Sequence, residues 1–288
     1  MGLDRNFISK QFGPHACAVT QGGIDAYALV TGGGANPAYA GGMAPPSYPV
    51  VYELPVLEKI WSDPALNGGE EQARNNVLML VHGDQRMAFH RPLRAGDEVS
   101  FTAHIDGIED KGSGEVLALR TESRAGGELV CESKWGLFIR GIGSGKKPGA
   151  GKKPSAPSAK PAAEKAAPEA VFKSIVEIPA DITPRYAAAS NDRNPIHLDG
   201  DVAKAAGLKG VVVHGLCTMS TVMQSLIDGH LGGAPERLRS LAVRFSAPVY
   251  PGDTLTLECR DAGGGAVSFE VAGAGGVKVI KGGLAEFV

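Results

Sequence analysis

The 288-residue sequence predicts an α+β protein made of two tandem copies of one unit, each an antiparallel sheet with one main helix. A repeated motif is the first observation behind this prediction. FHRPLRAGD begins at Phe89 and FSAPVYPGD begins at Phe245, so that Phe, Pro, Gly and Asp recur at an offset of 156 (245 − 89). Each copy leads into alternating apolar and polar residues, as in half-buried strands, and each half contains one apolar stretch with helical spacing. An internal duplication accounts for all three features.

In the first half, residues 1 to about 20 show no clear pattern apart from a turn signal at Gly13-Pro14. An apolar-spaced stretch begins at Ile24 and ends in a run of glycines. We expect a first strand and turn here, carrying Asn36-Pro37, and then a helix over residues 48–60. Alternating residues predict strands at 78–89, 98–108, 114–123 and 129–140.

The second half repeats this plan, with a first strand and turn that carry Asn194-Pro195. A helix is expected to follow and to end at Asp228-Gly229, because its large apolar residues fall on one face at helical spacing. These residues are Leu216, Met219, Met223, Leu226 and Ile227. Alternating residues predict strands at 241–247, 254–261, 267–272 and 277–288.

A segment with almost nothing to bury separates the halves. Residues 141–170 consist mostly of Gly, Lys, Pro, Ala and Ser, a composition typical of flexible linkers. A basic tether for an acidic partner is the less favoured interpretation, because such charge runs are usually just solvated. The expected organisation is a first domain at 1–140, a linker at 141–170 and a second domain at 171–288.

Composition narrows the classes of function. With 43% hydrophobic and 21% charged residues and a formal net charge of −2, the bulk charge favours neither nucleic acid nor a membrane surface as a partner. The start of the chain lacks the apolar core of a secretory signal, and no apolar run approaches the ~20 residues that span a bilayer. The cysteines form no C-x-x-C pair, so we expect a cytoplasmic protein with reduced thiols and no metal site. They are Cys17, Cys131, Cys217 and Cys259.

The residues that carry chemistry gather between Tyr186 and Gly215. Asp192 and His197 are an acid and a base that together can hold one water and exchange protons with it. Between them, Asn194-Pro195 favours a tight turn over a helix, because proline fixes its own φ and disfavours the α region for the preceding residue. Gly215 stands where a helix begins, so its free N–H and the helix dipole suit a developing oxyanion. This set fits the addition of water to a carbonyl-conjugated double bond, or its removal.

The motif Asp192-Arg193-Asn194-Pro195-Ile196-His197, followed by Val213-His214-Gly215, resembles the signature of the MaoC-like (R)-specific enoyl-CoA hydratases, also called hydratase 2. That family commonly has a Ser-Gly pair before the aspartate, where this chain has Ser190-Asn191. The resemblance implies the hotdog fold, in which an antiparallel sheet wraps one long helix. Two such units in one chain imply a double hotdog, a pseudo-dimer that either stands alone or pairs again as a homodimer.

The resemblance also implies an activity, the hydration of trans-2-enoyl-CoA to (R)-3-hydroxyacyl-CoA or the reverse dehydration. Asp192 and His197 would activate water, Asn194 would orient it, and the Gly215 N–H would bind the thioester oxygen. No metal or redox cofactor is required, since CoA enters as part of the substrate. Its phosphates are expected to contact basic residues near the start of the helix. The candidates are Arg193, Lys204 and Lys209.

Two other classes of function remain open. A related hotdog enzyme would dehydrate a 3-hydroxyacyl-ACP or hydrolyse a thioester, and a non-catalytic acyl-thioester binding protein would keep the same fold. Taken singly, Asp192 and His197 are more commonly a turn-capping aspartate and a loop histidine. Their combination with Asn194 and Gly215 favours catalysis.

The first half lacks this set of residues. Tyr39 occupies the position of His197, and Gly32-Gly33-Gly34 replaces the acidic segment. Two interpretations have equal weight: the first half shapes the substrate site, its glycines leaving room for a long acyl chain, or it only completes the sheet and buries an edge. His82-Gly83 resembles His214-Gly215 but precedes a strand, so we expect no site there. The His214 side chain is expected to be structural.

Overall fold

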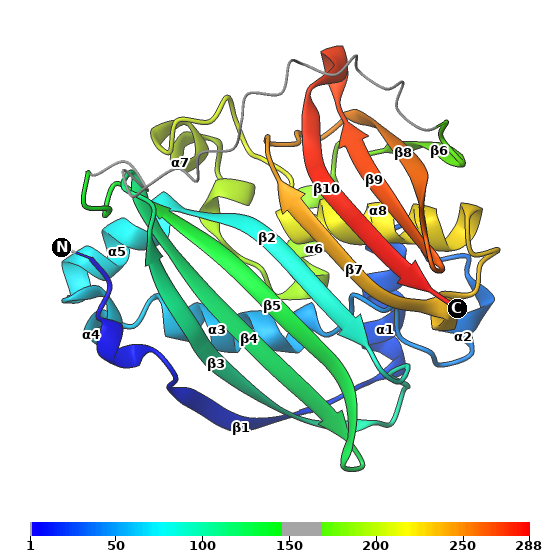
Figure 1. Cartoon of the computed structure of the whole chain (residues 1–288), viewed down its shortest axis with the longest axis horizontal. Coiled ribbons are helices and arrows are strands. Elements are labelled where there is room, and N and C mark those ends of the chain that lie inside the picture. The colour runs from blue at the N-terminus through cyan, green and yellow to red at the C-terminus, as the bar shows by residue number, and fades with distance from the viewer. Residues whose placement is uncertain (1, 146–168) are drawn as a thin grey trace, which may run out of the picture.

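The computed structural model describes residues 2–145 and 169–288, and its strands form one ten-stranded antiparallel sheet (Figure 1). The strand order is β1-β3-β4-β5-β2-β7-β10-β9-β8-β6. Outward from the central β2–β7 pair, the order of the second half repeats that of the first, with β10, β9, β8 and β6 in the places of β5, β4, β3 and β1. The predicted duplication is therefore visible in the topology. Most of the expected linker, residues 146–168, lies outside the described residues.

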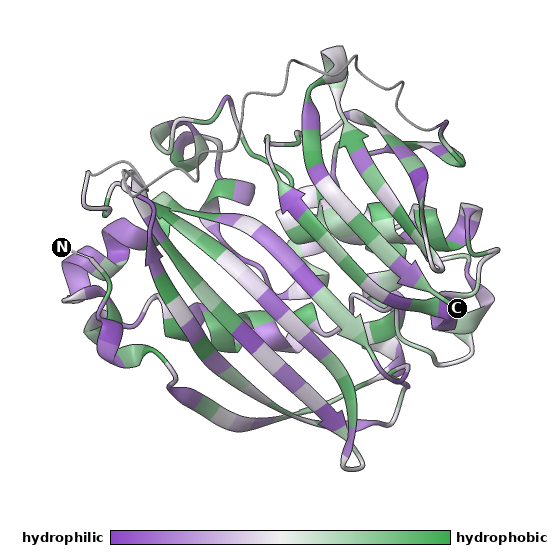
Figure 2. Cartoon of the chain, viewed as in Figure 1, coloured by the Kyte–Doolittle hydropathy of each residue, from purple (hydrophilic) through white to green (hydrophobic). Residues whose placement is uncertain are grey.

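The eight strands expected from alternation are all present, with ends within three residues of those expected. The first half contains β1 (Gln11–Ala18), β2 (Leu80–Phe89), β3 (Glu98–Asp110), β4 (Gly114–Ala125) and β5 (Glu128–Arg140). The second contains β6 (Phe172–Glu177), β7 (Leu238–Phe245), β8 (Thr254–Gly263), β9 (Ala266–Ala272) and β10 (Lys278–Phe287). Figure 2 shows the alternation along the central strands. Strands β1 and β6 had no individual prediction, because they are the two edges of the sheet and much of each is exposed.

The helices lie on one face of the sheet (Figure 1). They are α1 (Gln21–Val30), α2 (Pro37–Ala40), α3 (Val50–Trp61), α4 (Pro64–Asn67), α5 (Glu70–Met79), α6 (Ile182–Ser190), α7 (Gly200–Ala205) and α8 (Gly215–Gly229). Four single 3₁₀ turns accompany them: η1 (Arg5–Phe7), η2 (Pro195–His197), η3 (Pro235–Arg237) and η4 (Ala274–Gly276). The two expected main helices are α3 and α8, whose apolar residues are buried against the sheet. No described helix combines the length and apolar character that a membrane span requires.

One expectation about local structure was wrong. The segments before the two Asn-Pro pairs are not strands, because α1 precedes Asn36 and α6 precedes Asn194. Tyr27 and Tyr186 are fully buried on these helices, with ring centroids 6.0 Å apart. The helical conformation therefore reflects contact between the halves, which the short apolar spacing of each segment did not reveal.

The halves meet through backbone pairing of β2 with β7, in which Met87 lies opposite Leu241 and Asp84 opposite Arg244. Each strand would otherwise be an open edge of a five-stranded sheet. The interpretation that the first half buries an edge is confirmed.

A fully buried carboxyl group lies between α3 and the sheet of the first half. Glu53 is 0% exposed, and its Oε1 accepts a hydrogen bond of 3.0 Å from the Ser133 hydroxyl. Its Oε2 has no partner among the described residues. Burial is the main reason that the pKa of Glu53 rises from 4.5 to about 7. The protonated form therefore predominates in the folded protein below a pH of about 7.

We expect the protein to lose stability as pH rises from 5 to 8, because Glu53 must ionise without a cation. A folded-state pKa raised from 4.5 to about 7 costs about 3 kcal/mol in the free energy of unfolding once pH exceeds the folded-state value. Glu53→Gln should flatten this dependence, measured by urea unfolding at pH 5.5 and 8.5. Glu71→Gln, an exposed change on α5, is the control. The same change in the free energy of unfolding with pH in the wild type and in Glu53→Gln would contradict this account.

Candidate active site

A cavity of about 550 Å³ lies where the two halves meet. The first half lines it with residues of α3, α5, β2 and β5, and the second half with the Asp192–His197 turn, the start of α8 and the end of β7. This volume is typical of sites for small molecules. Asp192, Asn194, His197 and Gly215 all line it, so the structure brings together the four residues predicted to act on substrate.

The turn that carries the acid begins where α6 ends. Asn191 adopts a left-handed conformation, with φ of 65°, which glycine and asparagine tolerate best. Asparagine can therefore fill the place where the resembling family commonly has glycine. Asn194 has the non-helical ψ of 123° expected before proline, and its Oδ1 accepts from the Ile196 N–H at 3.2 Å. The expected tight turn is thus a single 3₁₀ turn, η2, capped by Asn194.

His197 is held in one tautomer. Its ring is 9% exposed, and Nδ1 lies 2.8 Å from the Val212 carbonyl oxygen. A carbonyl only accepts hydrogen bonds, so Nδ1 carries the proton and Nε2 of the neutral ring is an acceptor. The Asp192 carboxylate accepts from the Asn194 N–H at 3.2 Å. The site therefore presents two acceptors, the imidazole Nε2 and the carboxylate.

His214 packs against the pair formed by Asp192 and His197. It is 0% exposed at the N-terminus of α8, with its ring centroid 3.9 Å from that of His197. Its Nε2 lies 3.2 Å from the Asp192 carbonyl oxygen and donates to it. Burial lowers the pKa of His214 far below its usual value. A neutral, packed ring agrees with the structural role expected for this side chain.

Burial also favours the neutral forms of the two acting groups. It raises the pKa of Asp192, while the positive charge of a protonated His197 opposes this effect. It lowers the pKa of His197, while the negative charge of Asp192 opposes that effect. An uncharged His197 at neutral pH follows from the second shift. The two groups titrate as a pair.

Gly215 is the first residue of α8, so its N–H has no carbonyl partner within the helix. A Cβ atom at this position would lie 3.5 Å from the ring of Phe245, an ordinary contact. Packing against Phe245 therefore does not demand glycine here. Gly215 lines the cavity at the positive end of the helix dipole, where its N–H is suited to stabilise an oxyanion.

Three groups in the site are of types that bind metals. One atom each from Asp192, His197 and His214 lie within 4.8 Å of one another. Nε2 of His214 donates to a backbone carbonyl, so this nitrogen is not available as a metal ligand.

The three basic residues predicted to bind CoA phosphates are exposed and stand beside the cavity without lining it. Arg193 lies between two lining residues, and Lys209 follows the lining residue Leu208. Lys204 is 3.7 Å from Asp201. Their contact with CoA stays a prediction.

Sequence reasoning missed several residues that the first half contributes. His82 was dismissed because it precedes a strand, but in β2 it lines the cavity between Trp135 and Phe245, with ring centroids 5.2 and 5.1 Å away. Glu58 of α3 and Arg140 of β5 line the cavity as well. Only the pairing of the halves brings these residues to the Asp192 turn, so no local spacing reveals them.

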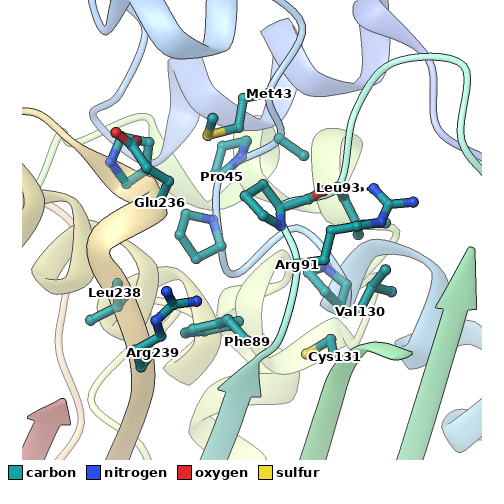
Figure 3. A pocket seen from close by; sticks show the side chains of 15 residues that line it. Met43, Pro45, Phe89, Arg91, Leu93, Val130, Cys131, Glu236, Leu238 and Arg239 are labelled. Carbon is teal, nitrogen blue, oxygen red and sulfur yellow. Dashed lines mark hydrogen bonds between the residues drawn. The ribbon is translucent and has the colours of Figure 1, made fainter. Parts of the chain in front are cut away.

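The equivalent place in the first half is closed. The repeat-related residues Phe89, Pro92 and Leu93 line a space of only about 30 Å³, about the share of one water (Figure 3). Prolines of the 45–49 segment help to line it. Tyr39, in the position of His197, donates its hydroxyl hydrogen bond to Gln224 at 2.8 Å.

The run Gly32-Gly33-Gly34 does not make room for an acyl chain. A Cβ at Gly33 would lie 2.6 Å from the Tyr39 ring and 2.8 Å from Gln224, and one at Gly34 would lie 3.1 Å from Leu29. None of these glycines lines the large cavity. The part of this interpretation that rests on the glycines was wrong. The first half lines the cavity through α3, α5, β2 and β5, and its role in shaping the substrate site stays a prediction.

Comparison with known proteins supports this picture. Residues 152–282 match the family described as MaoC like domain, and residues 7–133 match the FAS1-like, dehydratase domain region. The 3-hydroxyacyl-thioester dehydratase Y of Mycobacterium tuberculosis is 32% identical over 240 residues, which cover 78% of each chain.

Other relatives share only part of their length with this chain. The peroxisomal multifunctional enzyme type 2 of mouse is 32% identical over 198 residues, 67% of this chain but 26% of that enzyme. The peroxisomal enoyl-CoA hydratase 2 of Arabidopsis thaliana is 30% identical over 185 residues, 62% of this chain and 59% of that protein. This chain therefore spans about a quarter of the length of the mouse enzyme and about three fifths of the length of the Arabidopsis thaliana protein.

Solved structures share the fold. A MaoC-like dehydratase from Phytophthora capsici superposes with a TM-score of 0.77 at 24% identity, covering 100% of this chain and 98% of that one. A Mycobacterium tuberculosis protein described as having a double hotdog fold gives a TM-score of 0.57 at 16% identity, covering 96% and 94%. The chain belongs to the MaoC-like dehydratase family and has the double hotdog fold.

Proposed function

We propose that this protein is a hydro-lyase that adds water to trans-2-enoyl-CoA to give (R)-3-hydroxyacyl-CoA, or catalyses the reverse dehydration. The observation that carries the proposal is the pairing of two acceptors, Asp192 and His197 Nε2, beside the first N–H of α8 in a cavity of about 550 Å³. The names of relatives agree, since they include an enoyl-CoA hydratase 2 and a 3-hydroxyacyl-thioester dehydratase. The (R) configuration rests on the family alone.

The acting water is held by the two acceptors. A water that donates one hydrogen to Asp192 and the other to His197 Nε2 points an oxygen lone pair away from both groups, toward the substrate. The side-chain oxygen of Asn194 already caps η2, so its NH₂ group is the part left to orient the water or the substrate. The thioester oxygen accepts from the Gly215 N–H, which draws electrons from the double bond and makes Cβ electrophilic.

The proton balance closes within the pair. Water gives its oxygen to Cβ and one proton to the Asp192/His197 pair, and the pair returns one proton to Cα. The pair regains its starting protonation state, so no redox cofactor or metal ion has to take part. CoA serves as the carrier of the acyl group.

The first half supplies walls for the acyl chain. Leu54 and Trp61 of α3 and Leu137 of β5 line the cavity, and they give it apolar surface that extends away from the Gly215 N–H. This arrangement favours an acyl chain with several carbons beyond Cβ. The free cysteines support the expected cytoplasmic location, and acyl-CoA chemistry suggests a place in fatty acid metabolism.

A dehydratase acting on acyl carrier protein and a thioesterase would use the same cavity. Hydration and hydrolysis both need a pair that removes a proton from water and returns one, so the pair alone does not separate them. The names of relatives, an enoyl-CoA hydratase 2 and a 3-hydroxyacyl-thioester dehydratase, favour water addition. Hydration of an enoyl-CoA consumes ultraviolet absorbance without releasing thiol. A binding protein without catalysis would leave both signals unchanged.

Asp192→Asn should reduce kcat/KM on a trans-2-enoyl-CoA by about a thousandfold or more, because the amide cannot accept a proton. His197→Ala should have a similar effect. The measurement is loss of enoyl-thioester absorbance, with circular dichroism as the check on folding. Asp201→Asn, the same chemical change on a 97% exposed side chain, should retain activity. Near wild-type turnover by Asp192→Asn would disprove its role.

Activity should depend on pH only on the acid side. The active form has an ionised Asp192 and a neutral His197; burial raises the pKa of Asp192 above 3.8 and lowers that of His197 below 6.5. His197 therefore loses its proton below its usual pH range and Asp192 above its usual range, so kcat/KM should rise with pH along one acid limb set by the pair and then reach a plateau. A fall of kcat/KM at alkaline pH would contradict these protonation states.

Leu54→Phe should shorten the preferred acyl chain, because Leu54 is a lining residue on α3. We expect kcat/KM for a twelve-carbon enoyl-CoA to fall about tenfold relative to that for crotonyl-CoA, the effect of losing one or two methylene sites. Leu57→Phe is the matched control, because Leu57 is equally buried on the same helix without lining the cavity. An equal loss with both substrates would mean that Leu54 only packs the core.

A further inference from the structure

A carboxylate from the first half lines the same cavity as the acting groups of the second. On α3, Leu54, Glu58 and Trp61 recur at intervals of four and three residues, which places them on one helical face, and all three line the cavity. Asp192 lines the same cavity from the other half. The turn also contacts α3 directly, since the Asn191 side chain donates to the Val51 carbonyl at 3.4 Å.

No cation neutralises Glu58. Among the described residues, no Lys, Arg or His forms a salt bridge or hydrogen bond with its carboxylate, whereas thirteen such ion pairs occur elsewhere. Burial and the negative charge of Asp192 both raise the pKa of Glu58, so the two carboxylates interact across the cavity. The other charged lining residue, Arg140, is an exposed side chain whose Nε donates to the Met79 carbonyl.

We propose that Glu58 restricts the site to uncharged acyl groups by repelling short acyl chains that end in a carboxylate. The walls around it are mainly apolar, but Glu58 is exposed to solvent at the cavity, so the repulsion of a third negative charge near Asp192 and Glu58 is partly screened and should be strongest at low ionic strength. Specificity here comes from a repulsive group as well as from attractive contacts. The inference rests on the proposed acyl-CoA ligand, and it assigns to the non-catalytic half a direct part in substrate selection.

The experiment compares two pairs of ligands that differ by one carboxylate. Binding of butyryl-CoA and glutaryl-CoA is measured by calorimetry at pH 8, and turnover of crotonyl-CoA and glutaconyl-CoA is followed by absorbance. In the wild type, glutaryl-CoA should bind about tenfold or more weakly than butyryl-CoA, and Glu58→Gln should narrow this ratio about tenfold. The ratio of kcat/KM for the two enoyl substrates should shift in the same direction.

Matched variants separate a local charge from other effects. Glu58→Asp keeps the charge and should keep the discrimination between the two ligands. Glu71→Gln makes the same change in net charge as Glu58→Gln, but on an exposed residue that does not line the cavity, and should leave the discrimination unchanged. An unchanged ratio in Glu58→Gln, or equal wild-type affinity for the two saturated ligands, would overturn the proposal. The binding measurement needs no turnover. If Glu58→Gln shifts the ratio of the two binding constants but the protein hydrates neither enoyl-CoA, the proposed activity is disproved and the proposed role of Glu58 is retained.

Discussion

The pairing of β2 with β7 is the contact on which the rest of the molecule depends. It joins two five-stranded sheets into one ten-stranded sheet and leaves only β1 and β6 as edges. Because the helices of both halves lie on one face of this sheet, the pairing also brings α3 close to the turn that carries Asp192. The cavity exists only at this junction, and each half alone would supply an incomplete wall.

Burial governs the chemistry of the site. Backbone carbonyls of Val212 and Asp192 accept from His197 and His214, and so fix which nitrogen of each ring carries its proton. Removal from water keeps both rings neutral and leaves Nε2 of His197 able to accept a proton. The water-activating function thus depends on backbone geometry as much as on the two side chains.

The two halves differ at the equivalent places. The first half keeps the asparagine cap and the proline, but Tyr39 stands in the position of His197 and bonds to Gln224. Its α3 and β2 line the cavity of the second half, where they add apolar walls, an imidazole and a carboxylate. The cavity beside Asp192 and His197 is therefore built from both halves.

The sequence by itself determined the duplication, eight strands, both main helices and the Asp192–His197 motif with Gly215. These features depend on local spacing, on proline geometry and on a repeat that can be counted along the chain. Only the tertiary structure decided that α1 and α6 are helices and that His82, Glu58 and Arg140 belong to the cavity. The tertiary structure also decided that the glycines at 32–34 do not belong to the cavity. The physical reason is distance along the chain, because these residues acquire their surroundings from the other half, and a one-dimensional pattern does not encode that contact.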